Sequence, residues 1–365
     1  MPCLSRSAQR TAPTGWVRAL VLAVLLSAQW ASAQPLWYVL YDQGGLFEET
    51  RSLRAVALSD DEGAAYTSWL HGDTSRAVYE QSASLYNTVL HTYSMGTIQA
   101  KAIATDDRGN VYLGYGEHGN GQMEIRSANL GTQIVAPFNG GNTGQVEGLS
   151  IWKPDATTYY LYASRDDGTV QRFNVTNPAS PALDTSWATS GSYTVTGAGT
   201  LRGLEVASGG TIFVTQRDTS GTDRVGYVYA IDPFFLQTSA SVEGAMDVAI
   251  YNGELYISQY TGLDSGITVL NMSDLAFIEK LTVSAFPRTD DDYGYAGIDI
   301  ADDGSIYVSD QWYKIEGLGP DKTYYDRILT TFPVIYPEPG PIPEPATLLL
   351  LGVGLAALAR RRRTA

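Results

Sequence analysis

The sequence predicts an all-β protein, a six-bladed β-propeller of four-stranded blades spanning residues 34–336. Three observations predict this fold class. The chain is rich in strand and turn formers, with 24 Tyr and 37 Gly, and it has no long helical pattern. A unit of two alternating strands joined by a polar turn recurs six times. The copies are about 44 to 55 residues apart, which is the length of one propeller blade.

The repeat is clearest in the first hairpin of each unit. Examples are "AIATDDRGNVYLGYG" from Ala102, "DVAIYNGELYISQY" from Asp247 and "GIDIADDGSIYVSD" from Gly297. Their turns contain Asn-Gly or Asp-Asp followed by Gly, and Gly and Asn tolerate a positive φ at low cost. Two weaker strand signals follow each hairpin, which gives four strands per unit. The units start near Ala55, Ala102, Gly148, Gly203, Met246 and Gly297.

One strand near the start of the chain has no partner in the first unit. This segment, "PLWYVLYDQ" at residues 35–43, is expected to complete the sixth blade and close the ring. Closure would remove the exposed sheet edges that otherwise invite aggregation. In pattern alone, the body resembles the propeller superfamily that includes lactonase-like, YWTD-like and NHL-repeat proteins, although no YWTD tetrapeptide is present. A pair of β-sandwiches is the alternative fold.

The N-terminal residues 1–33 read as a secretory signal peptide. Arg6, Arg10 and Arg18 precede an apolar stretch, and Ala31-Ser32-Ala33 forms a small-x-small site for signal peptidase, with cleavage after Ala33. The only cysteine, Cys3, lies inside this segment. The mature chain is therefore expected to have neither disulfides nor thiol chemistry.

The C-terminus is predicted to be a sorting signal at residues 343–365, preceded by a Pro-rich linker at 337–342. Its apolar run at 346–359 is short for a membrane span, which needs about 20 residues. Flanking arginines can extend such a run by snorkelling. We therefore expect a short transmembrane helix whose arginine end stays in the cytoplasm.

This tail resembles the PEP-CTERM sorting signal of Gram-negative bacteria. Pro343-Glu344-Pro345 is followed by an apolar helix and then by Arg360, Arg361, Arg362 and Arg363. The resemblance implies that exosortase, a transpeptidase-like membrane enzyme, is the partner that cuts near the Pro-Glu-Pro. It also implies export across the inner membrane, transient anchoring, and a final place in the cell envelope, at the surface or outside the cell. Proteins with this signal usually accompany exopolysaccharide and biofilm production.

The charge of the body limits its partners. Residues 34–339 contain 17 basic and 38 acidic residues, which leaves a formal charge near −21. Such acidity argues against nucleic acid and against anionic membrane surfaces as partners. It is compatible with a soluble secreted protein that binds cations.

No pattern for nucleophilic catalysis is present. The sequence has no Gly-x-Ser-x-Gly elbow, and His71, His91 and His118 have no zinc-site spacing. The Asp-Asp pairs at the hairpin tips are expected to form turns, because they occupy the tip in unit after unit. The run Asp290, Asp291 and Asp292 lies between blades and can offer oxygen ligands to a cation, but a flexible acidic loop is the favoured interpretation.

The first strands of the blades suggest a polar channel. The residues that we align at their third position are Ala57, Ala104, Ser150, Glu205, Asp247 and Asp299. The basic and acidic residues that we expect to ring the same mouth are Arg54, Lys101, Glu147 and Arg202. Three inward carboxylates in close proximity need a cation or raised pKa values. Glu205, Asp247 and Asp299 are therefore candidate metal ligands, with calcium as the cofactor that lactonase-like propellers hold in this tunnel. A water-filled channel with internal salt bridges is the other interpretation.

Together these features favour an exported binding or scaffolding module linked to exopolysaccharide, rather than an enzyme. No catalytic residue is assigned. The alternative is a calcium-dependent, lactonase-like hydrolase or lyase.

Overall fold

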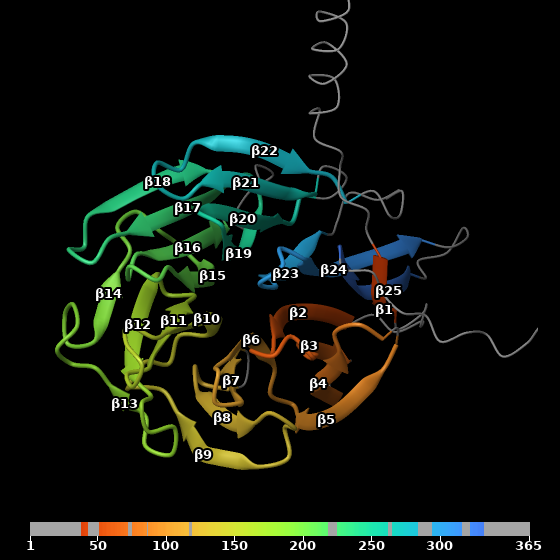
Figure 1. The fold of residues 1–365 in the computed structure, drawn as a ribbon, viewed down its shortest axis with the longest axis horizontal. Coiled ribbons are helices and arrows are strands. Elements are labelled where there is room, and N and C mark those ends of the chain that lie inside the picture. The colour runs from red at the N-terminus through yellow and green to blue at the C-terminus, as the bar shows by residue number, and fades with distance from the viewer. Residues whose placement is uncertain are drawn as a thin grey trace, which may run out of the picture. The chain divides into compact units, whose positions relative to one another are not determined.

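The computed structural model describes residues 38–42, 51–71, 75–85, 87–116, 119–217, 225–261, 265–283, 294–315 and 322–331. These residues form six antiparallel sheets arranged around a central axis (Figure 1), with no helix in the described part. The predicted six-bladed propeller is confirmed.

The first three blades follow one another along the chain. Blade 1 consists of β2 (Arg51–Leu58), β3 (Ala64–His71), β4 (Ser75–Ser82) and β5 (Val89–Gly96). Blade 2 consists of β6 (Ala100–Thr105), β7 (Asn110–Tyr115), β8 (Met123–Ser127) and β9 (Gln133–Phe138). Blade 3 consists of β10 (Val146–Trp152), β11 (Tyr160–Arg165), β12 (Thr169–Asn174), β13 (Ala182–Leu183) and β14 (Ser192–Thr194).

Blades 4 and 5 have the predicted four strands. Blade 4 consists of β15 (Leu201–Val206), β16 (Ile212–Arg217), β17 (Gly226–Ile231) and β18 (Gln237–Ser241). Blade 5 consists of β19 (Ala245–Tyr251), β20 (Glu254–Gln259), β21 (Ile267–Asn271) and β22 (Phe277–Leu281). Blade 3 departs from the four-strand pattern, because β13 and β14 both pair with β12.

Blade 6 joins the two ends of the described chain. It consists of β23 (Tyr295–Ile300), β24 (Ile306–Ile315), β25 (Lys322–Thr330) and β1 (Tyr38–Asp42), in the spatial order β23-β24-β25-β1. β1 pairs antiparallel with β25, from Tyr38 opposite Thr330 to Asp42 opposite Arg327. The predicted closing strand is thus confirmed for these residues, and Leu40 is almost fully buried in the seam between blades 6 and 1.

The hydrophobic core lies in layers between neighbouring blades. The second strand of each blade carries an aromatic residue, which lies between two apolar residues in blades 2 to 6 and between Ala65 and Thr67 in blade 1, and this aromatic residue packs against an adjacent blade. The six aromatic residues are Tyr66, Tyr112, Tyr162, Phe213, Tyr256 and Tyr307. Burial of such a side chain favours folding by roughly 1.5–3 kcal/mol. Each blade therefore depends on its neighbours for stability.

The hairpin turns follow the predicted chemistry. Asn252 and Gly253 have φ values of 49° and 81°, as a two-residue type I′ turn requires. In the Asp-Asp turns, a carboxylate oxygen accepts a backbone N–H two residues on: Asp61 from Gly63, Asp106 from Arg108 and Asp303 from Ser305. Their predicted role as turn formers is confirmed.

Candidate functional site

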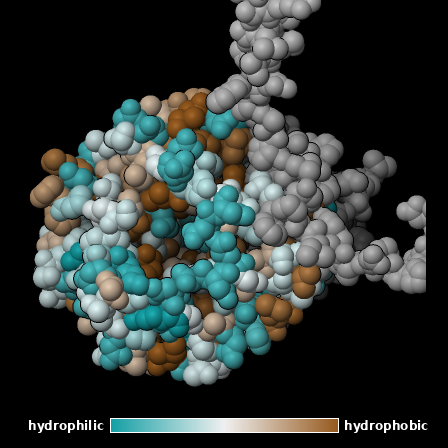
Figure 2. Space-filling model, viewed as in Figure 1, coloured by the Kyte–Doolittle hydropathy of each residue, from teal (hydrophilic) through white to brown (hydrophobic). Residues whose placement is uncertain are grey.

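The innermost strands of all six blades line a central channel. Small residues let these strands approach one another closely: a Cβ on Gly203 would lie 1.9 Å from Oδ1 of Asp247, and one on Gly297 would lie 2.8 Å from the backbone nitrogen of Val56. Hydrophilic residues surround the central hollow on the face that Figure 2 shows. The channel contains two cavities at different levels, of about 30 Å³ and about 190 Å³.

The smaller cavity is lined by the four charged residues predicted to ring the channel, Arg54, Lys101, Glu147 and Arg202, which we call the basic mouth. Glu147 joins three blades, because its Oε1 lies 2.7 Å from Nζ of Lys101 and its Oε2 lies 2.6 Å from Nη1 of Arg202. The predicted internal salt bridges of the channel are therefore present. The stem of Lys101 passes over Gly116, where a Cβ would lie 2.4 Å from Cδ of the lysine.

The larger cavity is lined by Glu205, Asp247 and Asp299, which we call the acidic chamber. The backbone N–H of Ile298 donates to Oδ2 of Asp247 (3.2 Å), and the backbone N–H of Leu58 donates to Oδ2 of Asp299 (2.7 Å). The hydroxyl of Ser150 donates to Oε1 of Glu205 (3.2 Å). All three bonds join neighbouring blades, so the carboxylates tie blades 3 to 4, 5 to 6 and 6 to 1.

Burial raises the pKa of each carboxyl group in the acidic chamber. The pKa of Glu205 rises to about 8, chiefly through loss of hydration and then through the charge of Asp299. Loss of hydration raises the pKa of Asp247 to about 7 and that of Asp299 to about 6, although backbone N–H donors to both oppose the rise. Near pH 7 the chamber therefore holds fewer than three negative charges.

The alignment that placed Asp247 level with Glu205 and Asp299 is wrong by two residues. Glu205 pairs with Phe213 and Asp299 with Tyr307, the aromatic residues of their second strands. In blade 5 the corresponding aromatic residue, Tyr256, pairs with Ala249, whereas Asp247 pairs with Ser258. The sequence alignment matched the three carboxylates with one another, whereas the strand pairing places Asp247 two residues earlier on its strand than Glu205 and Asp299 on theirs. Since side chains alternate with a period of two, Asp247 still faces the channel and lines both cavities.

Among the described residues, no three His, Cys, Asp or Glu side chains are placed to hold one metal ion. The three carboxylates of the acidic chamber already accept hydrogen bonds from backbone amides and from the Ser150 hydroxyl. Calcium binding by Glu205, Asp247 and Asp299 therefore stays a prediction from the sequence.

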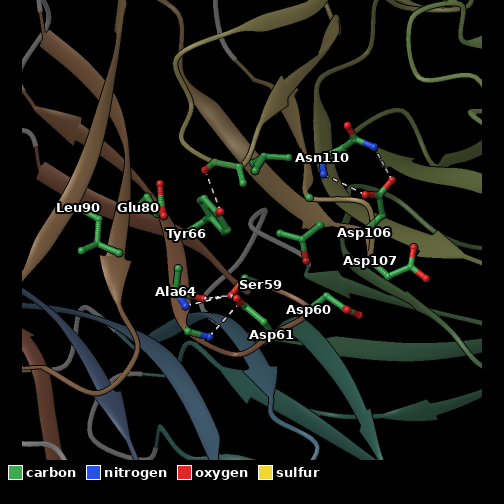
Figure 3. Close-up of a pocket in the computed structure, with 15 residues that line it drawn as sticks. Ser59, Asp60, Asp61, Ala64, Tyr66, Glu80, Leu90, Asp106, Asp107 and Asn110 are labelled. Atoms are coloured by element: carbon green, nitrogen blue, oxygen red, sulfur yellow. Dashed lines mark hydrogen bonds between the residues drawn. The ribbon is translucent and has the colours of Figure 1, made fainter.

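Sequence reasoning missed a groove at the opposite ends of the innermost strands. Two cavities, of about 410 Å³ and about 210 Å³, share Asp60, Thr105, Asp106 and Asp107, and together we call them the turn-face groove. Figure 3 shows the residues that line the larger cavity. The first hairpins of blades 1 and 2 supply these residues, and blade 3 adds Lys153 and Tyr159. The Asp-Asp pairs of the hairpins could have indicated this groove from the sequence, but we interpreted them only as turn formers.

Within the turn-face groove the paired aspartates have separate roles. Asp106 is buried and accepts hydrogen bonds from the Asn110 backbone N–H (2.9 Å) and the Tyr112 hydroxyl (2.8 Å), so it holds the turn. Asp107 accepts from the Tyr159 hydroxyl (2.7 Å), and its ion pair with Lys153 lowers its pKa. Asp60 is exposed to solvent.

An aromatic pair lies on the face of blade 3 that packs against blade 4, opposite the face that lines the turn-face groove. Trp152 and Tyr160, at the tip of the first hairpin of blade 3, stack with their ring centroids 5.8 Å apart and an interplanar angle of 25°. Both are only partly buried. On the groove side of the same hairpin, the Nζ of Lys153 lies 5.1 Å from the ring centroid of Tyr159.

The remaining predicted residues do not form a site in the described part of the chain. His91 is exposed, and its Nδ1 lies 2.7 Å from Oε2 of Glu80. The side chain of His71, together with His118 and Asp290–Asp292, lies outside what the structure describes, as do Ala33 and residues 343–365. No helix among the described residues is long and apolar enough to cross a membrane.

Residues 341–363 match the family model described as the PEP-CTERM protein-sorting motif. The chain carries an exosortase sorting signal. This PEP-CTERM signal implies export and exosortase-mediated sorting to the cell surface, so the propeller is the exported cargo. No curated protein matches the sequence. Among solved structures, the Neurospora crassa Pan2 WD40 domain is similar, with 8% identity and a TM-score of 0.47 over 81% of this chain and 95% of that one.

Proposed function

We propose that this PEP-CTERM protein is a binding module that holds a hydroxyl-rich polysaccharide of the extracellular matrix in its turn-face groove and does not cleave it. The observation that carries the proposal is the continuity of the groove. Its two cavities share four residues of blades 1 and 2, and the smaller one extends to blade 3, so their combined extent suits a chain rather than a compact ligand. The larger cavity falls within the ~300–1,000 Å³ of typical ligand sites.

The chemistry of the lining favours sugar hydroxyls. Asp60 is an exposed carboxylate, and ionised acceptors form stronger hydrogen bonds with hydroxyl donors than neutral acceptors do. Leu90 is an exposed apolar side chain that lines the larger cavity and offers a surface for the C–H side of a sugar ring. An apolar side chain among polar groups provides both kinds of contact.

The charge of the turn-face groove selects among polysaccharides. The carboxylates that line it are those of Asp60, Asp61, Glu80, Asp106 and Asp107. Asp106 is paired with Arg108 and Asp107 with Lys153, whereas the described ion pairs include none for Asp60 or Asp61. Uronate-rich polymers would bring like charges together, which costs free energy. We therefore expect a neutral polymer to bind better than an acidic one.

Calorimetric titration of purified neutral and acidic exopolysaccharide fractions tests the proposal. The neutral fraction should bind the parent protein, and Asp60→Asn should weaken binding by about tenfold, because one charge-assisted acceptor is lost. The matched control is Asp274→Asn, since Asp274 is also exposed but lies in the outer turn of blade 5. Equal affinity in all three proteins would overturn the proposal.

A second measurement separates binding from catalysis. Incubation of the protein with the bound fraction should release no new reducing ends. Time-dependent release that stops on chelation would instead support the calcium-dependent hydrolase or lyase.

A further inference from the structure

The basic mouth has an imbalance of charge. At one level of the channel, the six innermost strands present Arg54, Lys101, Glu147, Arg202, Met246 and Ala296. Three of these side chains are cations and one is a carboxylate, in a body whose formal charge is near −21. Met246 and Ala296 are neutral, so this ring of residues contains no second anion.

The one carboxylate is already shared. Both oxygens of Glu147 are bound, one by Lys101 and the other by Arg202. Lys101 has a further acceptor in Oε1 of Gln145, at 2.6 Å. Arg54 has no such arrangement: within the described part of the chain, its buried Nε has no acceptor, and neither has the buried Nε of Arg202. Because both Nε atoms are buried, the donors that can reach a ligand in the small cavity are the terminal Nη atoms of the two guanidinium groups, and those of Arg54 have no protein acceptor in the described part of the chain.

The next level of the channel does not supply the missing acceptor. Asp247 lines the same cavity, but its Oδ1 accepts the Val248 N–H (2.9 Å) and its Oδ2 accepts the Ile298 N–H. Burial also raises its pKa to about 7, which reduces its charge at neutral pH. The unused donors of Arg54 and Arg202 are thus left for a group from solution.

The size of the cavity limits that group. A volume of about 30 Å³ has room for about two water-sized atoms, since one water needs at least ~10–15 Å³ by this measure. A planar carboxylate presents two oxygens and matches the fork of a guanidinium. We infer that the basic mouth is a binding site for one carboxylate group of a small organic acid, held by Arg54 together with Arg202.

This site is independent of the turn-face groove. Arg54 precedes Leu58 on β2, whereas the groove begins after that strand, with Ser59 and Asp60. The two sites also differ in charge preference, because the groove disfavours anions and the basic mouth binds one. Loss of one in a variant should leave the other intact.

Thermal unfolding in sodium acetate, in sodium glucuronate and in sodium chloride of equal ionic strength and pH tests the site. Either carboxylate should raise the melting temperature of the parent above its value in chloride. The variant Arg54→Gln should lose that increment, and titration calorimetry should show at least a tenfold weaker affinity. The matched control Lys280→Gln removes one positive charge from an exposed position on β22 and should keep the full response.

Stability without added carboxylate separates binding from a structural role. Because the Arg54 Nε has no protein acceptor, Arg54→Gln should be at least as stable as the parent in chloride. The same increment in parent and Arg54→Gln would overturn the site, as would no increment in the parent. If Arg54→Gln fails to fold, the same measurements are made on Arg54→Lys, which keeps the positive charge but lacks the paired N–H donors of the guanidinium group. A larger response to glucuronate than to acetate identifies a sugar acid, and equal responses identify the carboxylate alone.

Discussion

The basic mouth and the acidic chamber lie a few residues apart on the same strands, yet they accommodate charge in opposite ways. In the basic mouth, side chains of blades 2, 3 and 4 form ion pairs, with Glu147 between Lys101 and Arg202. In the acidic chamber, carboxylates of blades 4, 5 and 6 have no cationic partner among the described ion pairs. They accept backbone N–H groups and retain protons instead.

A narrow channel can therefore hold buried ionisable groups in two ways, either as ion pairs or as protonated carboxyl groups that accept backbone hydrogen bonds. Ion pairing requires side chains long enough to meet across the ring, which Lys and Arg provide. Short aspartates reach only the backbone of the next blade, and loss of hydration then favours their neutral form. The two regions should therefore respond differently to the same perturbation.

Removal of the closing strand should have the largest effect. Deleting Tyr38–Asp42 leaves β25 unpaired and exposes the seam into which Leu40 packs. The loss should be several kcal/mol, a large share of the ~5–15 kcal/mol of a typical domain. Urea unfolding measures it, and an unchanged midpoint would contradict closure by β1.

Hydrogen exchange would sharpen the comparison in that variant. The Leu58 amide, bound to Asp299 across the seam between blades 6 and 1, should lose protection first. The Val206 amide, bound to Ser150 between blades 3 and 4, should keep its protection longer. The reverse order would show that the side of the ring with the basic mouth is the weaker one.

Neutralising one carboxylate at each level should give effects of opposite sign. Glu147→Gln leaves Lys101 and Arg202 without a counter-charge and should cost about 2–4 kcal/mol at pH 8, because an unpaired half-buried cation is poorly solvated. Glu205→Gln at the same pH removes a destabilising charge and should be neutral or stabilising. Denaturant titration of both variants measures the change in the free energy of unfolding, and an equal loss in the two would contradict the prediction.

The acidic chamber should also make stability depend on pH. Its carboxyl groups have pKa values of about 6 to 8 in the folded state, above their ordinary values. The folded state therefore binds more protons than the unfolded state between about pH 4 and pH 8. The stability that these protons provide is full below pH 4 and is lost as pH rises through the folded pKa values.

For these partly accessible groups we expect a loss on the order of 1–3 kcal/mol across that window, below the ~1.4 kcal/mol per unit of pKa shift that full burial implies. Calorimetry of the parent and of Glu205→Gln between pH 5 and pH 8.5 measures it. The difference in the free energy of unfolding between the two proteins at each pH gives the contribution of the Glu205 carboxyl group. A difference that grows toward low pH would have the wrong sign.

Calcium should have the smallest effect. If the acidic chamber takes the cation, calcium at about ten times its dissociation constant should stabilise the parent by about 1.4 kcal/mol. Asp247→Asn should remove most of that gain. The same variant should be about as stable as the parent without calcium, because relief of repulsion offsets one weakened bond to Ile298 or Val248. An identical calcium response in both proteins would leave the carboxylates as interblade acceptors only.

The repeat, the number of its copies and the turns within it could all be predicted from the sequence. Period-2 alternation and residues such as Asn252-Gly253 are local properties, so each hairpin could be predicted without its neighbours. The sorting signal was equally predictable, because its three parts are contiguous in residues 343–363. Even the closing strand followed from counting strands.

Only the tertiary structure decided what lies across blade boundaries. The level of Asp247 depends on its pairing with Ser258, which no count of acidic residues supplies. Glu147 meets Lys101 and Arg202 because three strands converge, over sequence separations of 46 and 55 residues. The turn-face groove likewise joins Asp60 to Asp107 across blades 1 and 2. Local rules fix each hairpin, but the close packing of six hairpins around one axis decides which side chains meet.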